Sequence, residues 1–531
     1  MSMALAGFRP LLAASLRHEL RGFAPWVAIA TGLSSSSVLV YPWVFPTAQD
    51  RAELATALSA NPALGIVFGP AFDLSTSEGF NSWRSLALAG FLTAIGAVFA
   101  VTRATRGQED SGQAELLASG VLSRAARLSA GVGVALIGSV LVGVVCGAVT
   151  GLCGGAWADS LLLAATFTAS GWMFTGVAAI TAQLGSDSRT ASSLAVGVLG
   201  VLFVMRGFAY SMDAPSWTIW VNPLGWMTQT KPAAGNDWSP LLFAVAFTVV
   251  ALGVAFTLHA RRDFAQGVIK TRPGPARGRV RSAWRLALVL NRGPVVTWCI
   301  AFVLLGGVFG YFATSIQDLL SKDSAVSAIL AAGATTPEAL TSAFLVTILN
   351  LVGIIAAVPG IQIMVKVRTE ESADRVEPVL AGAITRTRYY AANTVLALAT
   401  STGCVLIAGT VISSLAASAD IGVGFGDTMW QSVATIFAVW TVTAVSVAVI
   451  GARPHVWIAA WLGVLVAFVL TLLGPTFKLW DWVLAISPFW HVPNVTDSDI
   501  DWSGPVWISL VTVLLLAIGF TGFRRRDLAA G

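Results

Sequence analysis

The chain has 531 residues, of which 56% are hydrophobic and only 11% are charged, and its mean hydropathy is +0.77. Soluble domains carry about a quarter charged residues, so this composition excludes a water-soluble enzyme of the same length. It predicts an all-α polytopic membrane protein. The net charge of +5 leaves a nucleic-acid-binding role open until the charges are assigned to the two sides of the membrane.

Twelve apolar segments are long enough to span a bilayer core, which needs about 20 helical residues. They are predicted at 23–43, 85–102, 128–152, 160–184, 190–209, 240–259, 294–313, 342–366, 389–415, 428–450, 455–475 and 505–523. Before the first span, segment 8–21 has apolar residues at helical spacing, which predicts an amphipathic elbow helix at the cytoplasmic interface. The first apolar run is long for a signal peptide and no convincing cleavage site follows it, so we expect an uncleaved span.

The charges separate across the predicted membrane. If both termini are cytoplasmic, the inner segments hold 26 Lys/Arg and 11 Asp/Glu, whereas the outer segments hold 5 Lys/Arg and 16 Asp/Glu. The positive-inside rule counts Lys and Arg, and 26 against 5 strongly favours this orientation. We therefore expect a multi-pass cell-membrane protein with both termini cytoplasmic. The net charge does not require a nucleic-acid partner.

The segments after the second and the eighth spans repeat one pattern of residues. The first set is Arg106, Glu109, Glu115, Gly120 and Arg124, and the same residue types recur 262 positions later as Arg368, Glu371, Glu377, Gly382 and Arg386. The two halves also end alike, at Arg261-Arg262-Asp263-Phe264 and at Arg525-Arg526-Asp527-Leu528. A constant offset over a whole loop indicates a tandem duplication of a six-span unit.

Because six is even, both units enter and leave the membrane on the same side, which predicts two parallel six-helix repeats. We assign the first half to residues 1–264, with a coupling loop at 103–127, and the second half to residues 282–531, with a coupling loop at 367–388. Residues 265–281 form a basic cytoplasmic linker that contains Pro and Gly. The positive-inside rule explains its charge, and binding of anionic lipid headgroups is the alternative.

No catalytic or cofactor-binding motif is present in the sequence. The chain has no GxxxxGK[ST] phosphate-binding loop, no HExxH and no GxSxG. Its four histidines are scattered, and its four cysteines lie in apolar segments without CxxC spacing, so we expect neither a metal site nor a cofactor in this chain. If ATP drives transport, another polypeptide must hydrolyse it.

The repeated loops are the strongest candidates for a functional site. The spacing of Glu109, Glu115 and Arg124, mixed with leucines, predicts a short amphipathic helix with charged faces at the membrane exit. Such a helix suits docking of a soluble partner, and the alternative is a solvated loop whose acidic residues balance nearby arginines. The shared register in both halves favours docking, and it predicts a partner with two equivalent faces.

The predicted spans hold almost no charge. Apart from Lys366, the last residue of the eighth segment, Arg206 is their only fully charged residue, about 24 Å along its helix from the cytoplasmic end. It either snorkels outward toward Asp213 or contributes to the transport pathway or an outer gate. In the third span, four glycines at four-residue spacing from Gly143 to Gly155 predict close helix packing.

Several short motifs, taken in order, resemble those of a known group. Asn61-Pro62-Ala63-Leu64, followed by Phe68-Gly69-Pro70-Ala71-Phe72-Asp73, is similar to the first outer loop of actinobacterial polyketide-antibiotic exporter permeases. The tetronasin-resistance membrane subunits belong to that group. The loop at 106–124, the segment 223–226 and the run 261–275 fit it as well. The resemblance extends over essentially the whole chain and is strongest in the first half.

The resemblance implies an ABC-2-type permease with two fused six-helix halves, similar to type V ABC exporters. It also implies two copies of a separate ATPase subunit, which would bind ATP and Mg, and a hydrophobic small-molecule substrate. The implied ATPase-docking residues are Arg106, Glu109, Glu115, Arg124, Arg368, Glu371, Glu377 and Arg386. The second half departs from the pattern, because Pro378 takes the position of Leu116 and segment 488–491 takes that of segment 223–226.

These observations lead to one principal hypothesis and two alternatives. The principal hypothesis is the membrane permease subunit of an ATP-driven exporter of hydrophobic or amphipathic drugs and antibiotics, with no enzymatic activity of its own. The main alternative is a 6+6 secondary, ion-coupled drug transporter, which the absence of intramembrane carboxylates disfavours. The third class, a membrane scaffold or drug sensor, would bind ligand without moving it.

Overall fold

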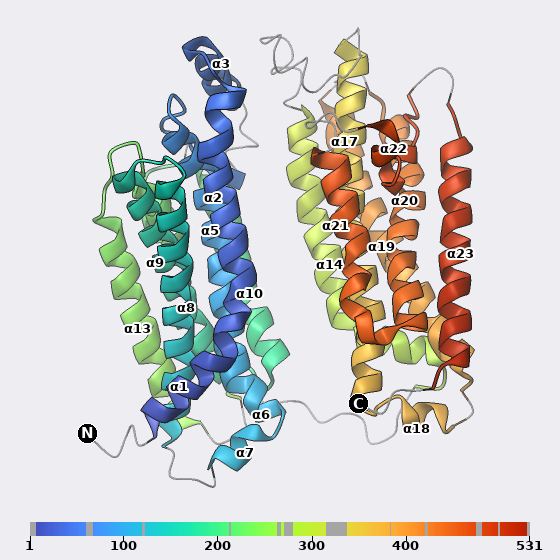
Figure 1. Cartoon of the computed structure of the whole chain (residues 1–531), viewed down its shortest axis with the longest axis horizontal. Coiled ribbons are helices and arrows are strands. Elements are labelled where there is room, and N and C mark those ends of the chain that lie inside the picture. Colours follow the sequence, from blue (N-terminus) through green and yellow to red (C-terminus); the bar gives the residue numbers. More distant parts are fainter. Residues whose placement is uncertain are drawn as a thin grey trace. The chain divides into compact units, whose positions relative to one another are not determined.

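A computed structural model gives the structure of the chain (Figure 1). It describes residues 7–59, 67–118, 123–211, 214–262, 267–269, 280–314, 337–382, 384–419, 423–473, 480–496 and 500–527. Some features predicted from the sequence lie outside these residues: the motif 61–64, Gly120, Asp213, the residues Asp263, Phe264 and Leu528 of the repeated ends, and the parts of the basic linker at 265–266 and 270–279. The chain divides into two compact units, Met1–Gly274 and Pro275–Gly531, and this boundary falls within the predicted linker. Each unit is described by itself.

The described residues are helical, without a β-strand. Twelve helical segments among them are long and apolar enough to cross a membrane, which confirms the predicted all-α, twelve-span fold. The spans of the first unit are α2 (Ala24–Val44), α5 (Ser77–Thr102), α8 (Arg124–Leu152), α9 (Trp157–Leu184), α10 (Ser188–Ser211) and α13 (Pro240–Arg261). Those of the second unit are α14 (Ala283–Thr314), α17 (Pro337–Ser372), α19 (Arg386–Ser418), α20 (Phe425–Ala452), the fifth span described below and α23 (Ser503–Arg525).

The fifth span differs between the units. In the first unit it is the single helix α10. In the second unit it consists of a 3-10 segment η4 (Pro454–Trp461), a short α-helix α21 (Leu462–Phe468) and a π-helical turn η5 (Val469–Leu473). Val456 has non-helical dihedral angles, which marks a kink inside η4. The fifth span is therefore irregular in the second unit.

Shorter helices lie at both ends of the spans. The elbow segment folds as α1 (Phe8–Glu19), which continues through a 3-10 turn η2 (Leu20–Phe23) into α2, and Leu12 and Leu16 pack against the core of the unit. The predicted outer end carries α3 (Ala48–Ser59), α11 (Trp217–Val221) and α12 (Pro223–Gln229) in the first unit, and α22 (Asp481–Leu484) and η6 (Pro488–His491) in the second. Figure 1 shows these elements at the opposite end of each unit from the coupling loops.

Matching residues begin the third span of each unit. At the start of α8, Ser123 Oγ accepts a hydrogen bond from the backbone amide of Ala126 (3.1 Å). At the start of α19, Thr385 Oγ1 accepts one from the amide of Arg388 (3.3 Å). A side-chain oxygen at this position satisfies an amide that has no partner within the helix. The two residues occupy the same register of the sequence repeat.

A second matching pair precedes the last span of each unit. Asp237 Oδ1 accepts a hydrogen bond from the Ser239 amide, and Asp501 Oδ1 accepts one from the Ser503 amide, both at 2.8 Å. These backbone hydrogen bonds hold the pKa of both exposed carboxyls below the usual value, because they favour the charged form. The two turns lead directly into α13 and α23.

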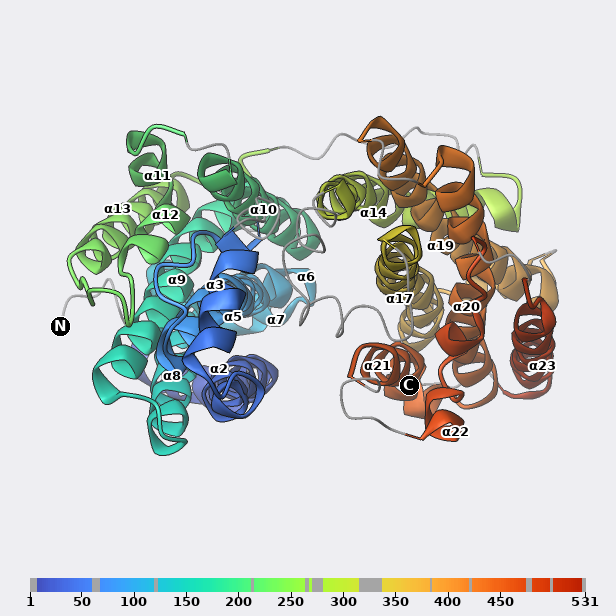
Figure 2. The same ribbon diagram turned by 90° about the horizontal axis from the view of Figure 1, so that it is seen from above.

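The same pairs of spans are in contact in each unit. In the first unit these pairs are α2 with α5, α2 with α8, α5 with α9, α8 with α9, and α9 with α13. In the second they are α14 with α17, α14 with α19, α17 with α20, α19 with α20, and α20 with α23. The second and fourth spans are the most buried of each unit, and Figure 2 shows α9 surrounded by α5, α8 and α13. The parallel orientation of the two repeats stays a prediction.

The predicted glycine face of the third span packs closely, as expected. A Cβ atom added at Gly143 would lie 2.2 Å from Thr168 Oγ1 and 2.6 Å from the carbonyl oxygen of Ala164, and one at Gly147 would lie 2.8 Å from the Cβ of Ala164. All three separations are shorter than van der Waals contact. Glycine therefore lets α8 and α9 approach each other at the level of their backbones.

Candidate functional site

The coupling loop of the first unit is a continuation of its second span. Helix α5 passes into a π-helical turn (Arg103–Gly107) and then into the short helices α6 (Gln108–Asp110) and α7 (Gln113–Ala118). Gly112, between α6 and α7, has a φ of 75°, a left-handed backbone conformation that favours glycine. The loop thus folds as two short helices rather than one. Glu109 lies on the first and Glu115 on the second.

A buried ion cluster holds this loop against two other spans. Glu109 Oε1 accepts a hydrogen bond from Arg262 Nη2 (2.6 Å), and its Oε2 accepts one from Arg106 Nη1 (2.9 Å). Arg106 also donates from Nε to the carbonyl oxygen of Ala182, near the end of α9. The side chains of Arg106, Glu109 and Arg262 are 1%, 7% and 7% exposed. The cluster joins the ends of the second, fourth and sixth spans.

The second unit contains an equivalent cluster. Both carboxylate oxygens of Glu371 accept hydrogen bonds from Arg526, through Nη1 to Oε1 and through Nη2 to Oε2 (2.7 Å). Arg526 Nε also donates to the carbonyl oxygen of Gly451, near the end of α20 (3.0 Å). Arg386 Nη1 donates to the carbonyl oxygen of Arg526 (2.9 Å). This cluster again joins the second, fourth and sixth spans, with the third attached through Arg386.

We call these two groups the loop clamps: Arg106, Glu109 and Arg262 in the first unit, and Glu371, Arg526 and Arg386 in the second. Buried ion pairs are costly to form, because both charges lose water, and they are stable only with good geometry and full hydrogen bonding. Here each glutamate is engaged through both oxygens. Removal of one partner would leave a buried charge uncompensated, so each clamp fixes its loop firmly to its unit.

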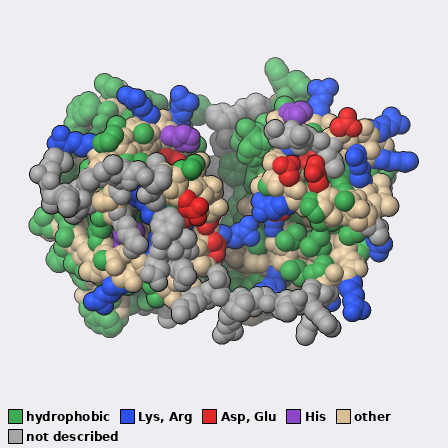
Figure 3. All heavy atoms as spheres, turned by 90° about the horizontal axis from the view of Figure 1, so that it is seen from below, with side chains coloured by type: hydrophobic (Ala, Val, Ile, Leu, Met, Phe, Trp, Pro, Cys, Tyr) green, Lys and Arg blue, Asp and Glu red, His purple; other side chains and the backbone are tan. Residues whose placement is uncertain are grey.

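Other predicted docking residues lie on the surface. Glu115, on α7, is exposed, and so is Glu377, the first residue of α18 (Glu377–Leu380). Leu116, beside Glu115, is 78% exposed although it is a large apolar residue. Figure 3 views this end of the units and shows Lys and Arg side chains spread over it, with acidic side chains in smaller groups. Single exposed apolar residues are common on protein surfaces, so Leu116 alone does not mark a binding site.

Two of the predicted docking residues remain, Arg368 and Arg124. Arg368 takes the register position of Arg106 but is only half-buried, and its buried Nη1 has no hydrogen-bond partner among the described residues. Arg526 instead makes the contact to the fourth span in the second unit. Arg124 begins α8, and its side chain lies outside the description. The structure therefore brings Arg106 to Glu109 but does not bring Arg368 to Glu371.

Arg206 is buried inside the first unit, with only 2% of its surface exposed. Its Nη2 donates to the carbonyl oxygen of Val67 (2.7 Å), and its guanidinium lies 4.7 Å from the centre of the Phe203 ring. Nε is buried and has no hydrogen-bond partner among the described residues. The side chain therefore does not snorkel to the surface. The segment at Val67 folds back over the end of α10 and supplies a carbonyl group in place of solvent.

Comparisons with known proteins identify the family. The model of the family "Multidrug efflux system permease Rv1217c, C-terminal domain" matches residues 50–259 and 280–524. The chain is also 33% identical, over 526 residues, to the "Multidrug efflux system permease protein Rv1217c" of Mycobacterium tuberculosis (strain ATCC 25618 / H37Rv), and the match covers 97% of this chain and 94% of that protein. The chain belongs to the Rv1217c family of multidrug efflux permeases. Membership confirms a membrane permease related to drug efflux, as the sequence predicted.

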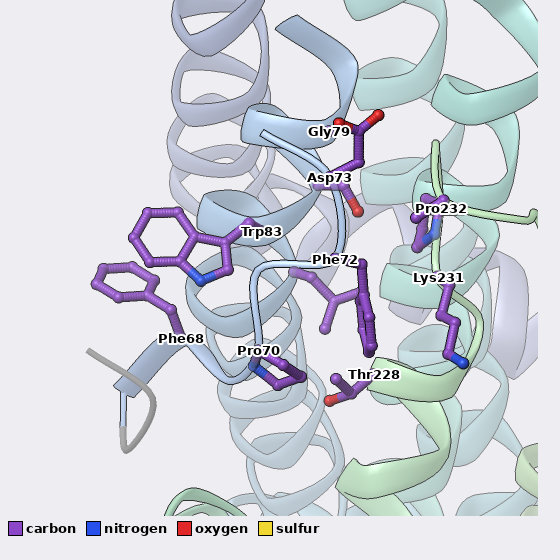
Figure 4. Close-up of a pocket in the computed structure, with 12 residues that line it drawn as sticks. Phe68, Pro70, Phe72, Asp73, Gly79, Trp83, Thr228, Lys231 and Pro232 are labelled. Carbon is purple, nitrogen blue, oxygen red and sulfur yellow. The ribbon is translucent and has the colours of Figure 1, made fainter. Parts of the chain in front are cut away.

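At the predicted outer end, this Rv1217c-family permease has a small pocket between the segment before α5 and the segment after α12 (Figure 4). The Trp83 ring is tilted against that of Phe68, with ring centres 4.7 Å apart, and Lys231 Nζ lies 5.0 Å from the centre of the Phe72 ring. Gly79 is required here, because a Cβ atom would lie 2.0 Å from the carbonyl oxygen of Asp73. The cavity of about 20 Å³ holds little more than one water molecule. It is too small for a drug molecule.

The arginines of the last spans were missed as site residues. Arg262 and Arg526 are prominent in the sequence because they belong to the repeated Arg-Arg-Asp ends of the two halves. That repetition was a signal of structural equivalence, but hydropathy and spacing do not show which distant carboxylate an arginine meets. No group of three or more His, Cys, Asp or Glu side chains that could hold a metal ion occurs in the described part of this permease.

Proposed function

We propose that this chain is the membrane permease subunit of an ATP-driven ABC-2-type exporter that extrudes hydrophobic or amphipathic drugs and antibiotics across the plasma membrane. Two copies of a separate ATPase subunit would bind ATP and Mg and dock on the two coupling loops from the cytoplasm, where both termini lie. Membership of a multidrug efflux permease family supports drug export. The resemblance to tetronasin-type exporters supports the ATP-driven class.

The observation that carries the proposal is the duplicated loop clamp. Each coupling loop continues the second span, and its glutamate is bonded to an arginine at the end of the sixth span. Further hydrogen bonds reach carbonyl groups near the end of the fourth span. A displacement of α7 or α18 is therefore transmitted to three spans together, because charge-assisted hydrogen bonds in a buried site are short and strong. A device of this kind suits a permease that is moved by a partner.

The docking candidates then take two roles. Glu115 and Glu377 are exposed and would contact the ATPase directly. Glu109, Glu371 and Arg106 are positioning residues that hold the loops. Arg124, Arg368 and Arg386 stay docking candidates, and Arg386 also contributes to the second clamp.

The 6+6 secondary transporter is not favoured. Coupling to a proton or sodium gradient usually requires an ionisable residue in the middle of the membrane. Every Asp or Glu on a described span lies in the first or last turn of its helix or in the adjoining loop. Arg206 is buried deeper, but an arginine does not lose its proton in the ordinary pH range.

The proposal is tested by reversing the charge of both exposed glutamates, Glu115→Lys together with Glu377→Lys. We expect drug efflux from cells and drug-stimulated ATPase activity to fall at least tenfold, with normal expression, because the ATPase would meet repulsive contacts at both loops. The matched control reverses an exposed acid at the predicted outer end, Asp481→Lys, and should leave both activities near wild type. Unaltered efflux in the first variant would contradict the docking assignment.

A further inference from the structure

The two units differ at one short helix near the predicted outer end. In the first unit α12 begins with Pro223, and the preceding Asn222 side chain accepts a hydrogen bond from the Leu224 amide. In the second unit η6 begins with Pro488, and the preceding Ser487 side chain accepts one from the Phe489 amide. The two helices therefore have the same type of start. Counted from the prolines, Trp226 of the first unit and His491 of the second occupy matching positions.

In the first unit, Trp226 fills the space between α12 and α13. Its ring centre lies 5.9 Å from that of Phe243 and 6.0 Å from that of Phe247, both on α13. Its indole Nε1 donates to the carbonyl oxygen of Trp220 (2.6 Å). Three aromatic rings and one hydrogen bond close this position.

In the second unit other residues take the positions of Trp226, Phe243 and Phe247. His491 takes the place of Trp226, and, counted from Pro240 and Pro505, the positions of Phe243 and Phe247 are taken by Ile508 and Thr512. A cavity of about 300 Å³ is found here, and both His491 and Ile508 line it. The cavity thus lies where the second unit has smaller side chains than Trp226, Phe243 and Phe247 of the first.

Besides His491 of η6, residues of three helices and of the segment after α22 line this cavity. Helix α20 contributes Thr441, α21 contributes Gly463, the end of the α22 segment contributes Ile486, and α23 contributes Trp507. Figure 2 shows α21 and α23 on either side of α20, with α22 between them. Ile486 and Trp507 are 58% and 59% exposed, so the cavity is open at its rim. An opening lined by exposed apolar side chains suits the entry of a hydrophobic molecule.

The lining is apolar with one hydrogen-bonding group that is not fully engaged. The hydroxyl of Thr441 is paired with Thr512 Oγ1 (2.8 Å) and with the carbonyl oxygen of Phe437 (3.0 Å). His491 Nε2 lies 2.9 Å from the carbonyl oxygen of Ala485. A carbonyl oxygen only accepts, so Nε2 carries the proton, and Nδ1 of the neutral ring is an acceptor. A ligand held here needs an apolar body and one O–H or N–H donor.

We propose that this cavity of the second unit binds one hydrophobic drug-sized molecule, which donates a hydrogen bond from a hydroxyl or amine group to His491. Its volume is at the lower end of the range of ligand pockets, about 300–1,000 Å³, and its mainly apolar lining with a single polar group is typical of them. The neighbouring π-helical turn η5 fits this role, because such turns are frequent at functional sites. As a substrate site, the assignment rests on the proposed export function.

The test uses full-length protein in nanodiscs and a pair of probes, tritiated N-phenyl-1-naphthylamine, which has one N–H donor, and its N-methyl derivative, which has none. Wild type should bind one molecule of the N–H probe per chain above empty nanodiscs. His491→Trp restores the residue of the first unit, and it should weaken binding of both probes at least tenfold by filling the cavity. His491→Phe should weaken binding of the N–H probe several-fold and leave that of the N-methyl probe unchanged. Trp490→Phe, at the exposed neighbouring residue, is the control and should bind both probes as wild type does.

Equal binding of the N–H probe to wild type and His491→Trp would overturn the proposal. So would an equal loss of both probes in His491→Phe, because the imidazole would then have no hydrogen-bonding role. If His491→Trp instead releases a copurifying phospholipid in native mass spectrometry without changing probe binding, the occupant is a lipid acyl chain and the proposal is also wrong. Binding is measured without ATP or a partner, so failure of the export function leaves this result intact.

Discussion

At the scale of single residues, adjacent glutamates in the second coupling loop have different surroundings. Glu371 is buried and engaged by Arg526 through both oxygens, whereas Glu370, 17% exposed, pairs with the largely exposed side chain of Arg375, which is 62% exposed. A buried pair that loses one partner is typically destabilised by about 3–5 kcal/mol, whereas an exposed pair contributes about 0–1 kcal/mol. The two positions therefore provide a matched comparison in one helix.

We predict that Glu371→Gln lowers the melting temperature of the purified protein by several degrees, because Arg526 then lacks a counter-charge. The double variant Glu371→Leu with Arg526→Leu should be more stable than Glu371→Leu alone, since it leaves no buried charge. Glu370→Gln is the control and should melt within about a degree of wild type. The measurement is thermal unfolding followed by tryptophan fluorescence. Strictly additive effects of the two leucine substitutions would show that Glu371 and Arg526 do not act as a pair.

The sequence predicted these residues only in part. The constant offset between the loops correctly singled out Glu109 and Glu371 as equivalent positions. It did not show that they are buried, because amphipathic spacing alone does not distinguish a charged face toward solvent from one toward another helix. The partners, Arg262 and Arg526, lie more than 150 residues away along the chain, and only tertiary packing brings them to the loops.

At the scale of elements, the twelve spans were predictable because a membrane requires long apolar helices with internally paired backbones. The contacts between spans were less predictable, because a hydropathy pattern does not show which helices pack against each other. The glycines of the third span were an exception, because small residues at four-residue spacing indicate one closely packed face. The irregular fifth span of the second unit, η4 to η5, had no clear sequence signal apart from Pro454 at its start.

We predict that Gly143→Ala destabilises the first unit, because the new Cβ would meet the backbone carbonyl oxygen of Ala164 and force α8 away from α9. Overpacking of this kind typically costs about 1–3 kcal/mol. Gly200→Ala on α10 is the matched control, since no atom lies within 4 Å of its added Cβ, and it should be neutral or slightly stabilising. Thermal unfolding in the same detergent compares the two variants. Equal melting temperatures would contradict the close contact of α8 and α9.

At the scale of the whole molecule, two units share helix order, span contacts and a loop clamp, but they differ in the fifth span and around His491. The shared features suit a permease that receives the same movement from two identical partners. The differences assign the ligand cavity to one unit. The sequence predicted two repeats that are not identical. The loops repeat at a constant offset, whereas segment 223–226 and segment 488–491 differ.

The central claim is that this permease is driven by an ATPase partner. The most direct measurement is drug transport by the complex affinity-purified from its native membranes through a tag on this chain and reconstituted in proteoliposomes. We expect uptake that requires ATP and Mg, is inhibited by vanadate and is unaffected when a protonophore dissipates the proton gradient. Transport driven by a proton gradient in liposomes that contain this chain alone, without ATP, would contradict it.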